Sequence, residues 1–213
     1  MKSHRILLAD DHTIVIEGLR RILEPRFEIV GVAADGLALV SAARTLRPDI
    51  IVVDISMPLL NGIDAVGQIR KFDPDVKIIF LTMHSDVTYA TEALAAGGSA
   101  YVLKISAGEE ILAAIEAVFN GITYVTPSIS AAVARALRDR ENQTSGPHVV
   151  LTNRQREVLQ LLAEGKSLKE AAEVLNVSTR TVEFHKYQIM RKLGLHTNAE
   201  ITKYAVKLGI TQL

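Results

Sequence analysis

The chain has 213 residues, contains no cysteine and carries a formal net charge of zero. The absence of cysteine excludes a disulfide framework, thiol catalysis and cysteine-ligated zinc. No run approaches the ~18 consecutive apolar residues of a membrane span, and the first residues lack the apolar region of a signal peptide. We therefore expect a cytoplasmic protein of two small domains with no membrane partner.

Short apolar runs alternate with helical patterns over the first 120 residues. Runs such as Ile6–Ala9 and Ile50–Val53 are rich in β-branched residues and do not alternate with polar ones, which predicts strands buried on both faces. The alternation of strands and helices along the chain predicts a doubly wound parallel sheet. Further strands are expected over 76–81 and 100–103, and helices over 14–23, 37–46, 63–72, 88–96 and 109–119.

Polar residues follow four of these runs: Asp10 and Asp11, then Asp54, Thr82 and Lys104. Because ligands bind at the carboxyl ends of the strands in such sheets, we expect these side chains to share one crevice. Carboxylates this close repel one another unless a hard divalent cation lies among them, and oxygen ligands favour Mg²⁺. Asp54 is then free to act as a nucleophile that forms an aspartyl phosphate, with Lys104 and Thr82 binding its oxygens.

The region over 1–122 resembles the receiver domain of bacterial two-component response regulators, a flavodoxin-like fold with five parallel strands. The resemblance implies that Asp54 accepts a phosphoryl group from a sensor histidine kinase. It also implies that Asp11, Asp54 and the backbone carbonyl of Ser56 hold Mg²⁺, with help from Asp10. The matching stretches are Leu8–His12, Asp54–Pro58 with Gly62, Leu81–Thr82 and Tyr101–Lys104.

The same resemblance implies a conformational switch in this domain. Thr82 would move toward the phosphoryl group, and Tyr101 would turn inward as space opens behind it. Without phosphate the two packings should differ by only a few kcal/mol, which a new charged group can overcome.

Residues 123–148 are expected to connect two domains. Thr126 as N-cap and Pro127 in the first turn predict a helix over 127–140, whose apolar side needs a partner. Glu141–Pro147 is polar and rich in turn formers, which predicts a flexible linker.

Residues 149–213 contain several helix-start signals. Three stretches fit the capping-box pattern and precede apolar-periodic segments, namely Thr152 with Gln155, Ser167 with Glu170, and Thr197 with Glu200. A fourth helix should begin near Ser178, a few residues after the short helix that starts at Ser167. This spacing predicts an all-α domain with a helix-turn-helix.

The helix after Ser178 has two distinct faces. Val182, Ile189 and Leu193 share the face that should be buried. Arg180, Phe184, Tyr187 and Arg191 share the opposite one, where two aromatic rings between cations suit a helix in a DNA major groove. A solvated face or a protein-protein patch is the alternative for this surface.

This region resembles a LuxR-type DNA-binding domain and, with the receiver, the NarL/FixJ group of response regulators. The resemblance rests on Leu151–Leu159, Gly165–Ala172 and Ser178–His185. It implies a recognition helix from about Thr179 to Leu193. Residues nearest the bases would be Glu183, Phe184 and Tyr187, and candidates for phosphate contacts are Lys166, Lys169, Arg180 and Lys186.

The charge is divided between the two regions. Residues 1–128 carry 11 Lys and Arg against 16 Asp and Glu, a net −5, whereas residues 149–213 carry 10 against 6, a net +4. The basic excess therefore lies at the proposed DNA-binding end. It is modest, so useful affinity should require two copies of the chain on paired half-sites.

We interpret the chain as a transcriptional regulator, not an enzyme. Phosphorylation of Asp54 is expected to shift the receiver, to release or reorient the basic domain across the linker, and to favour a homodimer on DNA that is able to contact RNA polymerase. A regulator with the same DNA-binding domain that works without phosphorylation is the alternative. A phosphotransferase or phosphatase with an aspartate nucleophile is disfavoured, because haloacid-dehalogenase-type enzymes carry a second acid where this chain has Ser56.

Overall fold

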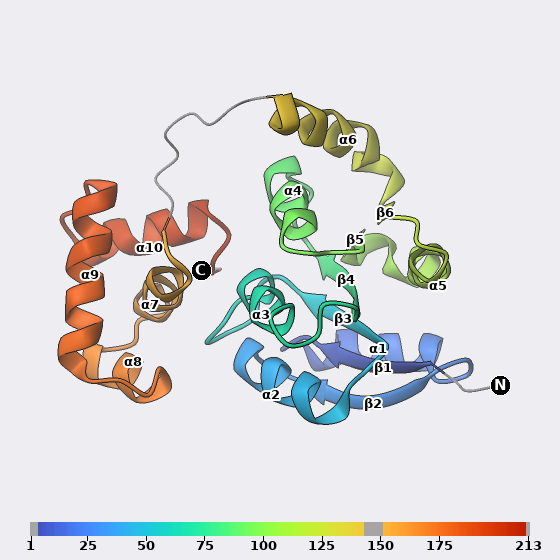
Figure 1. Ribbon diagram of the computed structural model, residues 1–213, viewed down its shortest axis with the longest axis horizontal. Coiled ribbons are helices and arrows are strands. Elements are labelled where there is room, and N and C mark those ends of the chain that lie inside the picture. The colour runs from blue at the N-terminus through green and yellow to red at the C-terminus, as the bar shows by residue number, and fades with distance from the viewer. Residues whose placement is uncertain (1–3, 143–150, 212–213) are drawn as a thin grey trace.

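The structure is a computed structural model that describes residues 4–142 and 151–211. It contains a sheet with helices on both faces and, beside it, a domain of helices (Figure 1). Of the predicted linker Glu141–Pro147, residues 143–147 lie outside the described residues. In the described part of the chain, no helix is long and apolar enough to cross a membrane.

All strands of the sheet run parallel, in the order β2-β1-β3-β4-β5-β6. The strands are β1 (Arg5–Ala9), β2 (Glu28–Ala33), β3 (Ile50–Asp54), β4 (Lys77–Thr82), β5 (Ala100–Leu103) and β6 (Tyr124–Val125). The doubly wound parallel sheet is thus confirmed, but it has six strands where five were expected. The additional strand has two residues, too few for a hydrophobic pattern, and pairs Val125 with Tyr101 at the sheet edge.

Each central strand is buried on both faces because consecutive side chains enter different cores. In β1, Leu7 joins the core under α2, α3 and α4, whereas Ile6 and Leu8 join the core under α1 and α5. Figure 1 shows this division of the helices between the two faces. The helices are α1 (Thr13–Leu23), α2 (Gly36–Leu46), α3 (Gly62–Ile69), α4 (Val87–Ala95) and α5 (Ala107–Phe119), preceded by a 3₁₀ turn over Lys104–Ser106.

The helix α6 (Pro127–Asn142) packs its apolar side on the receiver-like sheet domain. Val133 is buried in the core that α4 covers, and Ile129 and Leu137 pack against it. The hydroxyl of Thr126, just before the helix, accepts a hydrogen bond from the Leu103 backbone N–H and donates one to Glu110. The partner that this helix requires is therefore the sheet domain.

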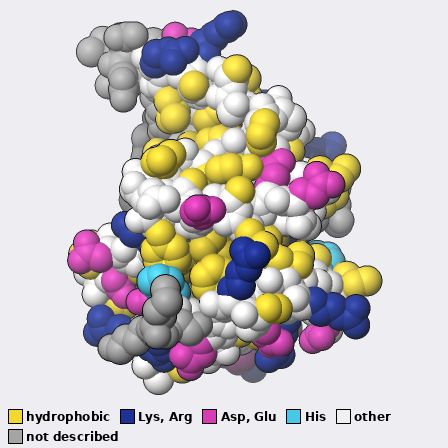
Figure 2. Space-filling model, turned by 90° about the vertical axis from the view of Figure 1, so that its right-hand side faces the viewer, with side chains coloured by type: hydrophobic (Ala, Val, Ile, Leu, Met, Phe, Trp, Pro, Cys, Tyr) yellow, Lys and Arg dark blue, Asp and Glu magenta, His cyan; other side chains and the backbone are white. Residues whose placement is uncertain are grey.

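The face of the sheet domain that lies away from the helical domain is partly apolar. Figure 2 shows hydrophobic side chains gathered across it. Ile105 and Ile122, which flank α5, are 88% and 61% exposed. This surface is available to a partner.

The helical domain consists of α7 (Asn153–Ala163), α8 (Leu168–Val174), α9 (Thr179–Leu193) and α10 (Asn198–Lys207). The three predicted capping boxes are present, at Thr152, Ser167 and Thr197, and Ser178 caps α9. Caps are local signals, which explains why the sequence predicted these helix starts correctly. The domain rests on the sheet domain through α7 (Figure 1).

Candidate functional site

Acidic side chains meet at the carboxyl ends of β1 and β3. Asp10 and Asp54 are each only 3% exposed, whereas Asp11 is exposed. Ligand atoms of Asp10, Asp11, His12 and Asp54 all lie within 4.8 Å of one another. Two of these carboxylates are held in a buried position that only a cation makes tolerable.

Lys104 supplies a positive charge to this cluster from the end of β5. Its Nζ lies 2.7 Å from Asp10 Oδ2 and 2.8 Å from Asp54 Oδ2, and the side chain is 9% exposed. Burial raises the pKa of Asp54, and the positive charge of Lys104 offsets only part of this rise. Burial lowers the pKa of Lys104, but the charges and hydrogen bonds of Asp54 and Asp10 together outweigh burial, so the pKa is raised. Lys104 therefore remains charged and neutralises part of the site.

The donor set suits a hard divalent cation. The carboxylates of Asp10, Asp11 and Asp54 offer oxygen ligands within a small space, which matches the preference of Mg²⁺. When bound, such an ion would offset the negative charge of a phosphoryl group that reaches this crevice. His12, which the sequence did not single out, contacts this set, since its Nδ1 lies 3.1 Å from Asp10 Oδ1 and 2.9 Å from Asp11 Oδ1.

We expect Lys104→Met to destabilise the chain by about 3 kcal/mol in EDTA, because the change leaves two buried carboxylates without a cation. Saturating Mg²⁺ should restore much of this loss, since the ion replaces the missing charge. Urea unfolding of wild type and variant with and without Mg²⁺ measures the difference. Lys71→Met, at an exposed position after α3, is the matched control. It should leave the free energy of unfolding unchanged both with and without Mg²⁺. An equal loss with and without Mg²⁺ would contradict metal binding at this cluster.

The residues expected to switch lie beside the acidic cluster. Thr82 and Tyr101 are both fully buried. The Tyr101 hydroxyl donates a 2.8 Å hydrogen bond to the His84 carbonyl, and the His84 N–H donates to Thr82 Oγ1. Tyr101 thus already lies inside, in the core that α4 covers, in the form that the structure describes.

His84 is a second residue of this region that the sequence did not single out. Its Nε2 lies 2.9 Å from the Ser56 hydroxyl, and its ring lies 4.5 Å from that of Tyr89 in α4, with the two ring planes tilted by 35°. Burial lowers the pKa of His84, while the charge of Asp54 opposes this. A single histidine after a strand carries no sequence signal for such a position.

The segment from Ser56 to Asn61, between β3 and α3, turns sharply beside Asp54. Gly62, at its end, allows this approach, because a Cβ there would lie 2.1 Å from the Asp54 carbonyl oxygen. Leu59 has φ of +66°, a conformation that is rare for a branched residue. The segment therefore has a constrained backbone next to the acidic cluster.

The helical domain presents α9 to solvent. Val182 and Ile189 are buried as predicted, whereas Phe184 and Tyr187 are 58% and 61% exposed. The guanidinium of Arg191 lies over the Tyr187 ring at 6.0 Å. Also exposed are Thr179, Arg180, Glu183 and Arg191 on α9 and Lys169 in α8, and Lys166 and Lys186 are partly exposed.

The position of α9 relative to the sheet domain bears on regulation. In Figure 1, α9 lies at the outer edge of the helical domain, and α7 lies between it and the sheet domain. The face that carries Phe184 and Tyr187 is thus uncovered while the two domains are in contact.

Family comparisons match both regions of the chain. The response regulator receiver domain matches residues 6–116, and the luxR family of bacterial regulatory proteins matches residues 149–205. The chain is 38% identical over 210 residues to the oxygen regulatory protein NreC of Staphylococcus aureus (strain bovine RF122 / ET3-1). The match covers 95% of this chain and 97% of NreC.

Solved structures of the RcsB response regulator of Salmonella are similar over nearly the whole chain. One, on conformational dynamism for DNA interaction, has a TM-score of 0.66 at 29% identity and covers 98% of this chain and 99% of RcsB. Another shows RcsB bound to a promoter in the presence of the phosphomimetic BeF3⁻, with a TM-score of 0.59 at 29% identity, covering 99% and 100%.

Proposed function

The chain belongs to the NarL/FixJ family of response regulators and is a phosphorylation-controlled transcriptional regulator of a two-component system, and from this premise we propose that Asp54 is its phosphoacceptor. The observation that carries the proposal is the position of Asp54, buried at the end of β3 with Lys104 Nζ 2.8 Å away. We assign Mg²⁺ to Asp10, Asp11, Asp54 and the backbone carbonyl of Ser56.

In the proposed reaction, a carboxylate oxygen of Asp54 attacks the phosphorus of a phosphohistidine on a sensor kinase. The new O–P bond forms as the N–P bond breaks, and the kinase imidazole leaves with the electron pair. Lys104 holds an oxygen of the transferred group by charge, and the hydroxyl of Thr82 moves to donate to another. Tyr101 already lies inside and has no inward turn left to make, so the proposed movement is that of Thr82. The chain acts on its own aspartate and converts no separate substrate.

The proposed DNA contacts lie on α9. Glu183, Phe184 and Tyr187 would face base edges in the major groove, and the apolar rings suit thymine methyl groups. Promoter-bound RcsB supports this assignment. The contacts with phosphates or groove edges are assigned to Lys166, Lys169, Thr179, Arg180, Lys186 and Arg191.

Phosphorylation is proposed to act by pairing two copies of the chain. Because α9 is already uncovered in the docked form, we place the controlled step at pairing and not at the uncovering of α9. A homodimer on paired half-sites gains affinity through effective concentration, and it can then contact RNA polymerase. The proposal places the protein in the cytoplasm, where its DNA lies, with a receiver over 1–122, a connection over 123–148 and a DNA-binding domain over 149–213.

The test is DNA affinity measured on duplexes with one or two half-sites, first selected from random sequences with the beryllofluoride-treated protein. Beryllofluoride with Mg²⁺ should tighten binding to two half-sites by about 100-fold, and binding to one half-site by much less. Equal affinity with and without beryllofluoride on both duplexes would favour the alternative, a regulator that works without phosphorylation. Fluorescence anisotropy at fixed salt provides the measurement.

A further inference from the structure

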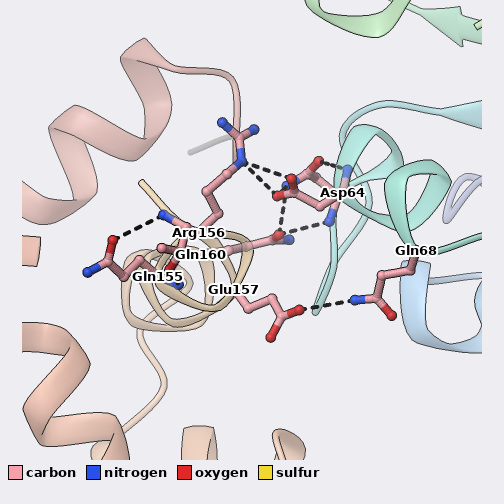
Figure 3. A network of polar contacts seen from close by, with 8 residues as sticks. Asp64, Gln68, Gln155, Arg156, Glu157 and Gln160 are labelled. Carbon is pink, nitrogen blue, oxygen red and sulfur yellow. Dashed lines mark hydrogen bonds and ion pairs between the residues drawn. The ribbon is translucent and has the colours of Figure 1, made fainter. Parts of the chain in front are cut away.

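The contact between the two domains is built on the segment that follows Asp54. It joins one side of α7 to the β3–α3 segment and to α3 (Figure 3). We call this the α7 contact. Its members are Arg156, Glu157, Gln160 and Glu164 from α7 and Met57, Leu59, Asn61, Asp64 and Gln68 from the sheet domain.

Gln160 lies at the centre of the α7 contact and is fully buried. Its Nε2 donates to the Met57 carbonyl at 2.9 Å and to Glu164 at 2.8 Å. Its Oε1 accepts from the backbone N–H of Asn61 at 2.8 Å and from Asn61 Nδ2 at 3.2 Å. These four hydrogen bonds use both donors and both lone pairs of the amide. Such complete use of a buried amide defines one arrangement of residues 57–61.

Leu59 shows that the helical domain also holds the backbone of this segment. Its N–H donates to the Glu164 carboxylate at 3.2 Å, and its side chain packs against the core of the helical domain. A positive φ at such a residue persists only where surrounding contacts impose it. Within the sheet domain, the Leu60 N–H donates a 2.8 Å hydrogen bond to the Pro58 carbonyl across Leu59. The helix α7 adds the Glu164 hydrogen bond and the packing of the side chain, so the constraint on the segment lessens when α7 departs.

Two polar pairs flank Gln160. Arg156 Nε lies 2.8 Å from Asp64 Oδ1, and Gln68 Nε2 donates to Glu157 at 3.0 Å. Both pairs join α7 to α3, as Figure 3 shows. They are partly exposed and contribute less than the buried amide.

A bound cation and Gln160 act on neighbouring peptide groups. The Ser56 carbonyl is the proposed Mg²⁺ ligand, and the next carbonyl in the chain, that of Met57, accepts the hydrogen bond from Gln160. Any rearrangement of this segment on phosphorylation must therefore act on the α7 contact. By linkage, the α7 contact must affect binding at the acidic cluster to the same degree.

We propose that Gln160, in the DNA-binding domain, is a positioning residue of the phosphorylation site: it holds residues 57–61 in the arrangement that disfavours Mg²⁺ and phosphate. The inference rests on the proposed function, because it takes Asp54 and the Ser56 carbonyl as that site. The direction follows from the constraint at Leu59, to which docking adds a hydrogen bond and packing that undocking removes. Phosphorylation and docking then oppose each other, although α9 stays uncovered in both forms.

The test replaces Gln160 in the full-length chain. Gln160→Leu leaves the Met57 carbonyl and the Asn61 N–H without partners in the docked form and should weaken docking. Isothermal titration with MgCl₂ alone should then show an affinity at least roughly fivefold higher than wild type. The rate of phosphorylation by acetyl phosphate should rise with it. Gln188→Leu, on α9 and outside the α7 contact, is the matched control and should equal wild type.

A second variant separates polar contact from packing. Gln160→Glu keeps the size of the side chain but places an acceptor against the Met57 carbonyl and the Glu164 carboxylate. It should therefore raise Mg²⁺ affinity as Gln160→Leu does. Wild-type affinity in Gln160→Glu would overturn the role of the hydrogen bonds.

Docking itself can be followed by cross-linking, because the chain has no cysteine of its own. Cysteines placed at Gln68 and Glu157 should be joined by a short bis-maleimide, and the yield should fall severalfold when Gln160→Leu is added. An unchanged yield and an unchanged Mg²⁺ affinity would overturn the inference and leave phosphorylation of Asp54 intact. Failure of every variant and of wild type to acquire phosphate would instead overturn the proposed function.

Discussion

Asp54→Ala is expected to abolish the phosphate adduct that the wild-type chain acquires from acetyl phosphate and Mg²⁺. The variant loses one of the two buried carboxylates that contact Lys104, and no alanine atom can attack phosphorus. Intact mass detects the adduct, and sedimentation of the same samples follows dimer formation. The dimer shift should disappear together with the adduct.

Asp10 is the residue that tests this assignment most strictly. Its Oδ2 lies as close to Lys104 as that of Asp54, and it is equally buried. Asp10→Asn should slow phosphorylation, because it removes a cation ligand, but should still yield the adduct. An adduct that persists in Asp54→Ala and disappears in Asp10→Asn would place the acceptor at Asp10.

The meeting of Asp10, Asp54 and Lys104 could be predicted because each follows a buried strand. Parallel strands end at one edge of the sheet, so a strand pattern plus a polar residue locates the crevice without any long-range information. Helix starts could be predicted for a similar reason, since a capping box lies within four residues. These features depend on local sequence.

The α7 contact could not be predicted in this way. Gln160 and Leu59 are ordinary residues in a helix and in a turn. Gln160 contacts Asn61 and Leu59 contacts Glu164, pairs about a hundred residues apart in the chain. The sixth strand was missed because two residues are too few to show a hydrophobic pattern. His84 was missed because its role depends on Ser56 in a different strand-end segment. In each case the property belongs to a pair of distant segments.

The uncovered position of α9 changes what docking can regulate. A docked chain can present Phe184 and Tyr187 to a single half-site, but it holds the segment after Asp54 in one arrangement. In the proposed mechanism, the two functions of the chain therefore communicate through α7, while α9 is available to DNA in the docked form. The proposed mechanism therefore controls the pairing of two chains separately from the contact of α9 with DNA.

The double change Arg180→Ala and Tyr187→Ala is expected to weaken binding to a selected duplex by about 3 kcal/mol, roughly 100-fold in Kd, at fixed salt. Both side chains are exposed on α9, away from the buried face at Val182 and Ile189, so thermal stability should change little. Anisotropy titrations over a range of salt concentrations measure the effect.

Lys203→Ala is the matched control for the charge that Arg180→Ala removes, because Lys203 is exposed on α10. Loss of one cation anywhere on the domain weakens attraction to phosphates and lowers the salt slope by up to about one unit. Only loss of a contact in the groove also reduces the preference for the selected duplex over a scrambled one. If Arg180→Ala and Lys203→Ala reduced affinity equally and left that preference unchanged, α9 would supply general charge only. A larger loss of preference for the α9 variants identifies this helix as the one that reads the sequence.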